Sequence, residues 1–342
     1  MESQIIKRSP SNIAIVKYWG KHGNQLPNNP SISFTLTNCF TETKITYDDS
    51  ETQRLRDSET QFSFDFYFEG KESQAFKDKI EKFILKNEQY FTFLKGLHFK
   101  IESYNSFPHS SGIASSASSM SALVMCLLGI KYKDSEIDMQ EASFLSRLAS
   151  GSAARSVYPT MTLWGKTPAL SNSSDEYAVP IGDMINPIFK SYHDTILIVS
   201  SKEKSVSSRA GHSLMNNHPM AESRYATARK NTEDLLTILK QGDLEGFIKI
   251  AEAEANQLHD LMATSTPAYT LKEPNTVNII NKILEFREDT SLPICYTLDA
   301  GPNVHLLYPD FCKDKVHVFI EDVLKDFCHN NKYINDRVSA DS

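Results

Sequence analysis

Residues 108–129 read PHSSGIASSASSMSALVMCLLG, a loop of serine and glycine that runs directly into an apolar sequence rich in alanine and leucine. The apolar part predicts a helix, and the start of a helix presents unpaired backbone N–H groups and the positive end of the helix dipole. These features make an anion site, to which small side chains allow a phosphate close access. The segment lacks the Gly-Lys-Ser/Thr ending of a Walker A loop. Taken alone, it is equally compatible with a flexible connector before a core helix.

Length, charge and cysteine content narrow the class of protein. At 342 residues, the chain is longer than most single cores, so two domains are expected. The 36 basic and 43 acidic residues give a formal net charge of −7, which argues against nucleic acid or an anionic membrane as the main partner. We expect no signal peptide and no membrane span, because no apolar stretch approaches roughly 20 residues. Five scattered cysteines indicate free thiols in a reducing cytoplasm.

The apolar pattern predicts an α+β protein, because strands and helices mix without a regular βαβ rhythm. We expect a division near residue 190, giving one domain over residues 1–190 and a second over residues 191–342. Strands are predicted over 12–19, 31–37, 41–47, 62–68, 97–103, 195–200, 293–298 and 304–308. Helices are predicted over 74–94, over the apolar sequence that follows the serine-rich loop, and over 138–149, 221–262 with a break at 241–243, 275–287 and 316–327.

Two short segments bring cations together with small or hydroxyl-bearing residues. Residues 17–21 read KYWGK, where two lysines and a tyrosine could face one pocket, although lysines at a strand end are more often solvated. Residues 150–156 read SGSAARS, a turn of small residues that contains Arg155. Arginine is suited to bidentate recognition of a carboxylate or a phosphate. Each segment is compatible with contacts to an anionic ligand, but neither alone establishes them.

Two further segments lie in the second half of the chain. Residues 207–209 read SSR and repeat the combination of hydroxyls with an arginine. Residues 298–303 read LDAGPN and place Asp299 on a tight turn directly after a strand. An aspartate before glycine and proline commonly caps such a turn, so capping and chemistry both remain open for Asp299.

In combination, these motifs resemble the mevalonate diphosphate decarboxylase family of the GHMP kinase superfamily. KYWGK and DAGPN are more specific than the serine-rich loop, which many small-molecule kinases share. The resemblance implies a two-lobed GHMP kinase fold, with a ribosomal-S5-like N-terminal lobe and a ferredoxin-like C-terminal lobe. It also implies a cytoplasmic homodimer of the mevalonate pathway of isoprenoid biosynthesis. The matching segments, in the family's order, are Pro10–Lys21, Phe107–Ala117, Ser150–Ser156, Ser207–Arg209 and Asp299–Asn303.

The resemblance further implies an ATP-dependent decarboxylation, in which the 3-hydroxyl of mevalonate 5-diphosphate is phosphorylated and phosphate leaves with CO2 to give isopentenyl diphosphate. Asp299 would act on that hydroxyl, Arg155 would hold the substrate carboxylate and keep Asp299 ionised, and Lys17 would neutralise the transferred phosphoryl group. Substrate contacts would come from Tyr18, Lys21, Ser150, Ser152, Ser208, Arg209 and His212. ATP phosphates bridged by Mg2+ would lie against Ser110, Gly112, Ser115, Ser116, Ser118 and Ser119, with Ser116 also a metal ligand.

One position departs from the family. His212 stands where bacterial relatives typically have methionine after the SSR segment, and a histidine facing the substrate would gain charge near neutral pH. The alternative is a histidine that points to solvent. This departure leaves mevalonate 5-phosphate open as the substrate. A GHMP kinase that stops at phosphorylation is a more distant alternative, disfavoured by the combination of Lys17 and Asp299, and a catalytically silent binding protein would be expected to lack Asp299 or the serine-rich loop.

Overall fold

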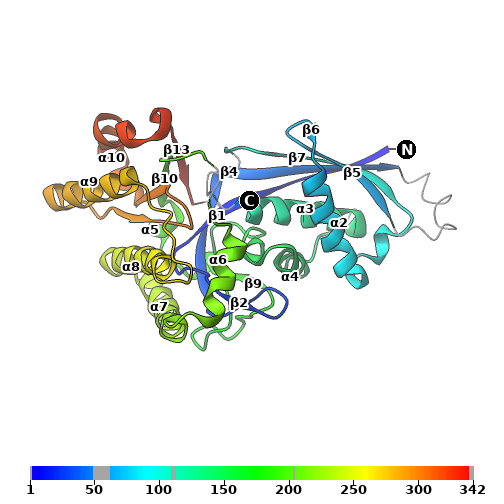
Figure 1. Cartoon of the computed structure of the whole chain (residues 1–342), viewed down its shortest axis with the longest axis horizontal. Coiled ribbons are helices and arrows are strands. Elements are labelled where there is room, and N and C mark those ends of the chain that lie inside the picture. The colour runs from blue at the N-terminus through cyan, green and yellow to red at the C-terminus, as the bar shows by residue number, and fades with distance from the viewer. Residues whose placement is uncertain are drawn as a thin grey trace.

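The computed structural model describes residues 2–48, 62–108, 113, 115–133, 135–202 and 205–338. Within these residues the strands form a seven-stranded sheet of order β6-β5-β7-β4-β8-β9 with β1 paired to β4, a four-stranded sheet of order β11-β12-β10-β13, and the small pair β2-β3. Figure 1 shows β5, β6 and β7 toward one end of the molecule and helices α7 to α10 toward the other. The strands are β1 Glu2–Ala14, β2 Lys21–His22, β3 Leu26–Pro27, β4 Ser31–Asp48, β5 Ser63–Phe68, β6 Lys71–Glu72, β7 His98–Asn105, β8 Met161–Trp164, β9 Ala178–Pro180, β10 His193–Leu197, β11 Cys295–Thr297, β12 Val304–Tyr308 and β13 Tyr333–Arg337.

The two long strands β1 and β4 are the centre of the larger sheet. They pair antiparallel from Glu2 opposite Asp48 to Ala14 opposite Ser33, with a register shift between Pro10 and Asn12. The prediction of separate strands over 31–37 and 41–47 is wrong, because β4 runs unbroken through both. The strand predicted over 12–19 overlaps β1 only at residues 12–14, and the chain leaves the ladder before the KYWGK segment.

The strand predicted over residues 62–68, in which phenylalanine occupies every second position, forms β5, which pairs antiparallel with β6. Phe64 and Phe66 are buried, so the alternating phenylalanines belong to the core. The predicted strand over 97–103 is β7, which pairs parallel with β5. The predicted helix over 74–94 ends earlier, because α2 stops at Lys86 and two 3-10 turns follow it.

Helices α2 (Gln74–Lys86), α3 (Ser115–Tyr132) and α4 (Met139–Ala149) lie together below the larger sheet in Figure 1. Helix α3 is apolar on nearly every side and is buried from Ala117 to Ile130, except at Ser119 and Met125. A helix that is hydrophobic all round belongs inside a protein core, which confirms the prediction for this segment. None of the helices in the described ranges combines the length and the apolar character that crossing a bilayer requires.

Helices α7 (Ala221–Gln241) and α8 (Leu244–Ala263) confirm the predicted helical pair and its break. Gly242 ends α7 in the left-handed conformation at φ 78°, and the Asp243 side chain caps α8 by accepting from the Gly246 N–H. The remaining helices are α5 Pro187–Lys190, α6 Ser208–Leu214, α9 Pro274–Thr290 and α10 Lys313–Phe319. The helix predicted over 316–327 begins earlier and continues beyond Phe319 as a π turn and a 3-10 turn.

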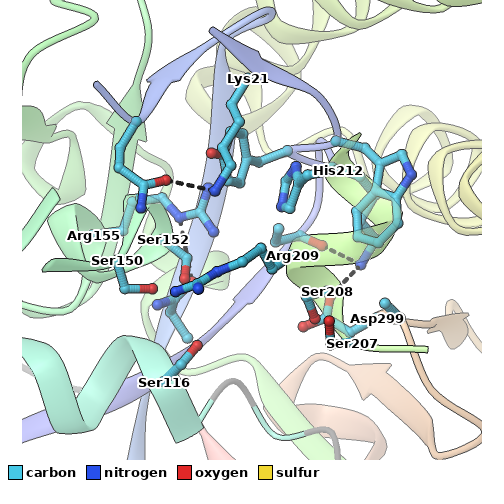
Figure 2. A pocket seen from close by; sticks show the side chains of 18 of the residues that line it. Lys21, Ser116, Ser150, Ser152, Arg155, Ser207, Ser208, Arg209, His212 and Asp299 are labelled. Atoms are coloured by element: carbon cyan, nitrogen blue, oxygen red, sulfur yellow. Dashed lines mark hydrogen bonds and ion pairs between the residues drawn. The ribbon is translucent and has the colours of Figure 1, made fainter. Parts of the chain in front are cut away.

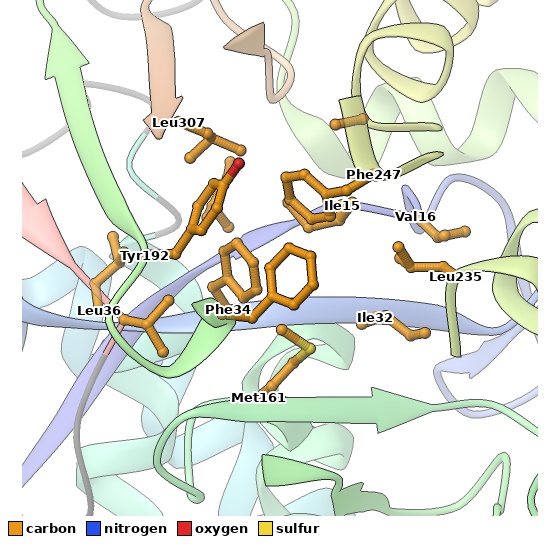
Figure 3. Packing of buried hydrophobic residues seen from close by; sticks show 14 of the residues in the cluster. Ile15, Val16, Ile32, Phe34, Leu36, Met161, Tyr192, Leu235, Phe247 and Leu307 are labelled. Carbon is orange, nitrogen blue, oxygen red and sulfur yellow. The ribbon is translucent and has the colours of Figure 1, made fainter. Parts of the chain in front are cut away.

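One hydrophobic cluster joins the two sheets. Figure 3 shows Phe34, Tyr192 and Phe247 packed together, and their ring centroids lie 5.2–5.9 Å apart. Phe34 comes from β4, Tyr192 precedes β10 and Phe247 lies on α8, so residues from both sides of position 190 share this core. The structure thus has two larger sheets joined by a shared core, while the division at residue 190 stays a prediction.

Candidate active site

The five predicted segments meet at one cavity of about 420 Å³, a size typical of small-molecule sites. Figure 2 shows their side chains around it. Ser150, Ser152 and Arg155 lie in the segment that follows α4. Arg209 and His212 lie on α6, and Asp299 follows β11. The lining residues are Asn12, Ala14, Lys17, Tyr18, Trp19, Lys21, Gln25, Lys79, Ser115, Ser116, Ala149, Ser150, Gly151, Ser152, Arg155, Ser207, Ser208, Arg209, His212, Leu258, Asp299 and Ala300.

Lys17 and Asp299 form an ion pair at this cavity. Lys17 Nζ donates to Asp299 Oδ1 at 3.1 Å and to the Ala14 carbonyl at 2.5 Å. The lysine side chain is only 2% exposed, and its removal from water lowers the pKa of Lys17, an effect that the Asp299 charge partly offsets. Asp299 is the only carboxylate among the described residues that line the cavity. The pair therefore places one acidic and one basic group side by side at a ligand-sized space.

The turn that carries Asp299 is fixed on both sides. The Gly301 N–H donates to the Asp299 carbonyl at 2.7 Å. Asn303 Oδ1 accepts from the N–H groups of Val199 and Ser200 at 2.8 and 3.0 Å, which ties the turn to the end of β10. The DAGPN motif thus builds a rigid turn whose aspartate carboxylate reaches Lys17.

Arg155 lies buried in the short 3-10 helix Gly151–Arg155. Its guanidinium donates to Asn12 Oδ1 at 3.3 Å and to the Ser31 hydroxyl, so neutral groups orient it inside the protein. Burial lowers the pKa of Arg155 to about 10, although the nearby Asp299 acts in the opposite direction. At that pKa the side chain stays cationic at neutral pH and is available for an anion.

Tyr18 presents a hydroxyl without a hydrogen-bond partner in the described structure, although that oxygen is buried. A buried polar atom without a partner costs about 1–3 kcal/mol, so such an atom beside a cavity indicates that a polar ligand completes it. Gly151 makes room for this ring, because a Cβ there would lie 2.7 Å from the Tyr18 hydroxyl. Burial raises the pKa of Tyr18, which keeps the hydroxyl protonated as a donor.

Lys21, Lys79 and Arg209 gather cationic charge at the cavity. Partial burial and then the Arg209 charge lower the pKa of both Lys21 and Lys79. Lys21 Nζ donates to Gln25 Oε1 at 2.7 Å, a neutral partner that leaves its charge uncompensated by that contact. Arg209 lies on α6, and Figure 2 shows its side chain reaching across the cavity. Mutual repulsion among these groups favours a highly charged anion between them.

Two expectations for His212 are wrong: that the side chain gains a charge near neutral pH, and that it points to solvent. His212 lines the cavity but is 8% exposed, and its ring lies between Tyr18 and Trp19, with centroids at 4.4 and 4.7 Å. Its Nδ1 accepts the Gly20 N–H at 2.9 Å. Burial first, and then the charges of Lys21 and Arg155, lower the pKa of His212 to about 3. The imidazole is therefore neutral near pH 7, because the fold uses it as an acceptor within an aromatic stack.

The start of α3 divides the predicted ATP-phosphate residues. Ser115 and Ser116 face the cavity. Ser118 and Ser119 lie one turn further along, where both hydroxyls donate back to the Ser115 carbonyl, at 3.4 and 2.7 Å. Their assignment to the phosphate site therefore stays a prediction, since these hydroxyls bond to the backbone of their own helix. Ser110 and Gly112 lie outside the described residues.

Sequence reasoning missed several lining residues. Lys79 projects from α2, a helix whose exposed face carries several other lysines, so nothing in the sequence separates it from a solvated residue. Asn12 and Gln25 act through Arg155 and Lys21, and only the folded structure reveals these contacts. A cluster of three or more His, Cys, Asp or Glu side chains that could hold a metal is absent from the described residues.

Comparisons with known proteins agree with this architecture. Residues 9–177 match the diphosphomevalonate decarboxylase-like N-terminal domain, and residues 195–341 match the mevalonate 5-diphosphate decarboxylase C-terminal domain. The diphosphomevalonate decarboxylase of Candida albicans is 29% identical over 322 residues, which cover 90% of this chain and 85% of the relative.

Solved structures give the same result. The mevalonate diphosphate decarboxylase of Staphylococcus aureus is 27% identical and superposes with a TM-score of 0.84, covering 100% of this chain and 97% of the other. MDDEF, in complex with MVAPP, AMPPCP and magnesium, has the same fold at 24% identity, with a TM-score of 0.81 and coverage of 100% and 98%. Because the two family models together extend over nearly the whole chain and the motif residues converge on one cavity, the chain belongs to the mevalonate diphosphate decarboxylase family.

Proposed function

We propose that this chain catalyses the ATP-dependent decarboxylation of mevalonate 5-diphosphate to isopentenyl diphosphate, with ADP, phosphate and CO2 as the other products. A tertiary alcohol is a poor leaving group and a phosphate ester is a good one, so phosphorylation of the 3-hydroxyl prepares the loss of CO2. The observation that carries the proposal is the Lys17–Asp299 pair, at 3.1 Å, in a cavity whose other charged lining side chains, Lys21, Lys79, Arg155 and Arg209, are all cations.

Asp299 is proposed to orient the 3-hydroxyl and accept its proton. Lys17, whose ammonium group donates a hydrogen bond to Asp299, is proposed to stabilise negative charge on the transferred phosphoryl group. Arg155 is proposed to hold the substrate carboxylate, because it is a buried, oriented guanidinium on the same cavity. These three residues are the proposed catalytic groups.

A second group of cavity residues is proposed to hold the phosphate arm of the substrate. Lys21 and Arg209 supply charge for the two phosphates, and Tyr18 supplies a hydroxyl donor. Ser150, Ser152 and Ser208 are proposed as hydrogen-bonding side chains of the same pocket, and His212 as a neutral wall beside Tyr18.

The start of α3 is proposed as the ATP-phosphate site. Helix α3 begins at Ser115 with its N-terminal end toward the cavity, and Ser115 and Ser116 add hydroxyls there. Lys79 lies on the same cavity and adds a cation. Mg2+ would be held mainly by ATP phosphate oxygens with Ser116 as its protein ligand, and it would supply neutralisation of phosphate charge.

We also propose a cytoplasmic location and a homodimer. Each of the five cysteines is a buried, free thiol, which suits a reducing compartment. The homodimer rests on the family resemblance, and light scattering on the purified chain tests it.

A substrate comparison tests the proposed function. Purified enzyme is given ATP and Mg2+ with either mevalonate 5-diphosphate or mevalonate 5-phosphate, and ADP release is followed through a coupled assay. We expect kcat/KM for the diphosphate to be roughly 10-fold or more above that for the monophosphate, because one charge-assisted phosphate contact contributes about 1.5–3 kcal/mol. Equal or reversed values would contradict the choice of substrate.

A further inference from the structure

Lys17 and Asp299 both lie in segments without helix or strand structure, so their positions depend on groups that hold their main chains. A backbone N–H or C=O that lacks a ladder partner must be satisfied by other groups when it is buried. For both residues, one of the side chains that hydrogen-bond to the main chain belongs to the same helix, α8.

The main chain of Lys17 is held by a buried ion pair. Its N–H donates to Glu254 Oε2 at 2.8 Å, and its carbonyl accepts from Arg224 Nη2 at 3.2 Å and from Asn29 Nδ2 at 3.0 Å. Arg224 also binds both oxygens of Glu254, at 2.8 and 2.5 Å, and Asn231 donates to the same carboxylate. Glu254 is completely buried and lies on α8.

The main chain of Asp299 is held by His259, also on α8. His259 Nε2 lies 3.1 Å from the Asp299 carbonyl oxygen, and a carbonyl only accepts, so Nε2 carries the proton. His259 Nδ1 is buried without a hydrogen-bond partner in the described structure. Burial lowers the pKa of His259 to about 4, in agreement with a neutral ring. The ring therefore makes one polar contact, and that contact is to the residue that the proposed function places at the reacting hydroxyl.

We propose that α8 sets the geometry of the Lys17–Asp299 pair, with Glu254 holding the Lys17 main chain and His259 holding the Asp299 main chain. Five residues of helix separate the two attachment points, a rise of about 7.5 Å along a rigid axis. Glu254 and His259 are positioning residues, since they act through Lys17 and Asp299. The role in turnover rests on the proposed function, whereas the role in geometry stands on the contacts alone.

His259→Leu tests this inference, with His259→Gln as the conservative variant and His218→Leu as the matched control. His218 is also buried, and its Nε2 lies 3.1 Å from the carbonyl of Leu261 on α8, but its hydrogen bonds go to Leu261, Met220 and Thr264 rather than to Lys17 or Asp299. We expect His259→Leu to lower kcat by roughly 10- to 100-fold with little change in KM for ATP or mevalonate diphosphate, as a displaced catalytic group does. Glutamine retains a donor at similar reach, so His259→Gln should recover most of the loss.

Wild-type kcat in His259→Leu, an equal loss in His218→Leu, or no recovery in His259→Gln would overturn the inference. A double variant tests the frame as a unit. Glu254→Asp keeps the charge for Arg224 but withdraws the acceptor from Lys17, and its loss in kcat should combine with that of His259→Leu to less than the product of the two. Independent, multiplicative losses would count against a shared frame.

A crystal structure of His259→Leu makes the geometric claim independent of any substrate. We expect a clear displacement of the Asp299 carboxylate from Lys17 Nζ relative to a crystal structure of the unaltered protein, with the His218→Leu structure unchanged at this pair. An undisturbed pair in His259→Leu would overturn the inference even if the proposed function held. Absence of turnover in the unaltered enzyme would instead overturn the proposed function alone.

Discussion

Asp299 is the residue on which the proposed chemistry depends most directly. Asp299→Asn keeps the size of the side chain and removes its charge, so the 3-hydroxyl loses its proton acceptor. We expect kcat to fall by roughly 10³-fold, within the range of a general-base contribution. Steady-state turnover measures this change, and circular dichroism at the assay temperature confirms that the variant, whose Lys17 has lost a charged partner, remains folded. Near-normal kcat would return Asp299 to the role of a turn cap.

Arg209 is expected to act on binding rather than on the chemical step. Arg209→Ala should raise KM for mevalonate diphosphate by roughly 10- to 150-fold, the equivalent of a charge-assisted contact of about 1.5–3 kcal/mol. The KM for ATP should change little, because the proposed ATP-phosphate site lies at the start of α3. If the KM for ATP rises instead, the two phosphate sites have been assigned the wrong way round.

The burial of His212 predicts how the free energy of unfolding changes with pH. Well above pH 6.5, the ordinary pKa of histidine, the imidazole is neutral in both folded and unfolded chains and contributes no pH dependence. Below that pH the unfolded chain binds a proton that the buried ring, with a pKa of about 3, does not bind. The free energy of unfolding therefore falls as pH is lowered, by up to about 1.4 kcal/mol per pH unit from this group.

His212→Met should remove this contribution. Urea denaturation between pH 7 and pH 5 measures the free energy of unfolding of both proteins. Below pH 6.5 this free energy should fall less steeply with pH in the variant, because unfolding of the variant takes up about one proton fewer. Parallel stability curves for the two proteins would show that His212 is not buried as a neutral ring.

At the scale of elements, the first turn of α3 separates serines that line the cavity from serines whose hydroxyls bond to the backbone of the helix. Ser116→Ala should raise KM for Mg-ATP by roughly 10-fold or more, because Ser116 faces the cavity. Ser119→Ala should leave this KM within about twofold, since the Ser119 hydroxyl donates to the Ser115 carbonyl at 2.7 Å. Equal effects of the two substitutions would contradict the proposed orientation of α3.

Long periodic elements could be predicted from the sequence, and short ones could not. The helical pair α7–α8 carries its own signals, a glycine at the C-terminus of one helix and an aspartate at the N-terminus of the next. Strand β13 has the sequence YINDR, which lacks apolar alternation, and it forms because His193 to Leu197 of β10 pair with it. Helix α6 is seven residues long, and its position beside the cavity depends on tertiary packing.

The residues of the candidate site were also predictable only where the sequence carries a specific pattern. The motifs identified Lys17, Arg155 and Asp299 because glycine, serine and charged residues occur there in a specific order. Lys79 and His259 could not be found, because each lies on an amphipathic helix where a single polar residue carries no distinguishing pattern. Side-chain direction also escaped prediction at Ser118, whose hydroxyl contacts Thr41 Oγ1 at 2.7 Å on the neighbouring strand.

At the scale of the whole molecule, both halves of the chain contribute to the core and to the site. The cluster around Phe34, Tyr192 and Phe247 crosses the predicted boundary, and the Lys17–Asp299 pair joins residues 282 positions apart. A site assembled in this way exists only when the whole chain is folded. We propose that such a site couples phosphoryl transfer to the loss of CO2.

The stoichiometry of products tests that claim most directly. Enzyme, ATP, Mg2+ and mevalonate diphosphate labelled with ¹⁴C at its carboxyl carbon are sampled over time for ADP and for labelled CO2. The proposed function predicts one CO2 for each ADP throughout the steady state, with isopentenyl diphosphate as the organic product. ADP formed without CO2, together with a stable phosphorylated substrate, would identify a kinase and contradict the decarboxylase.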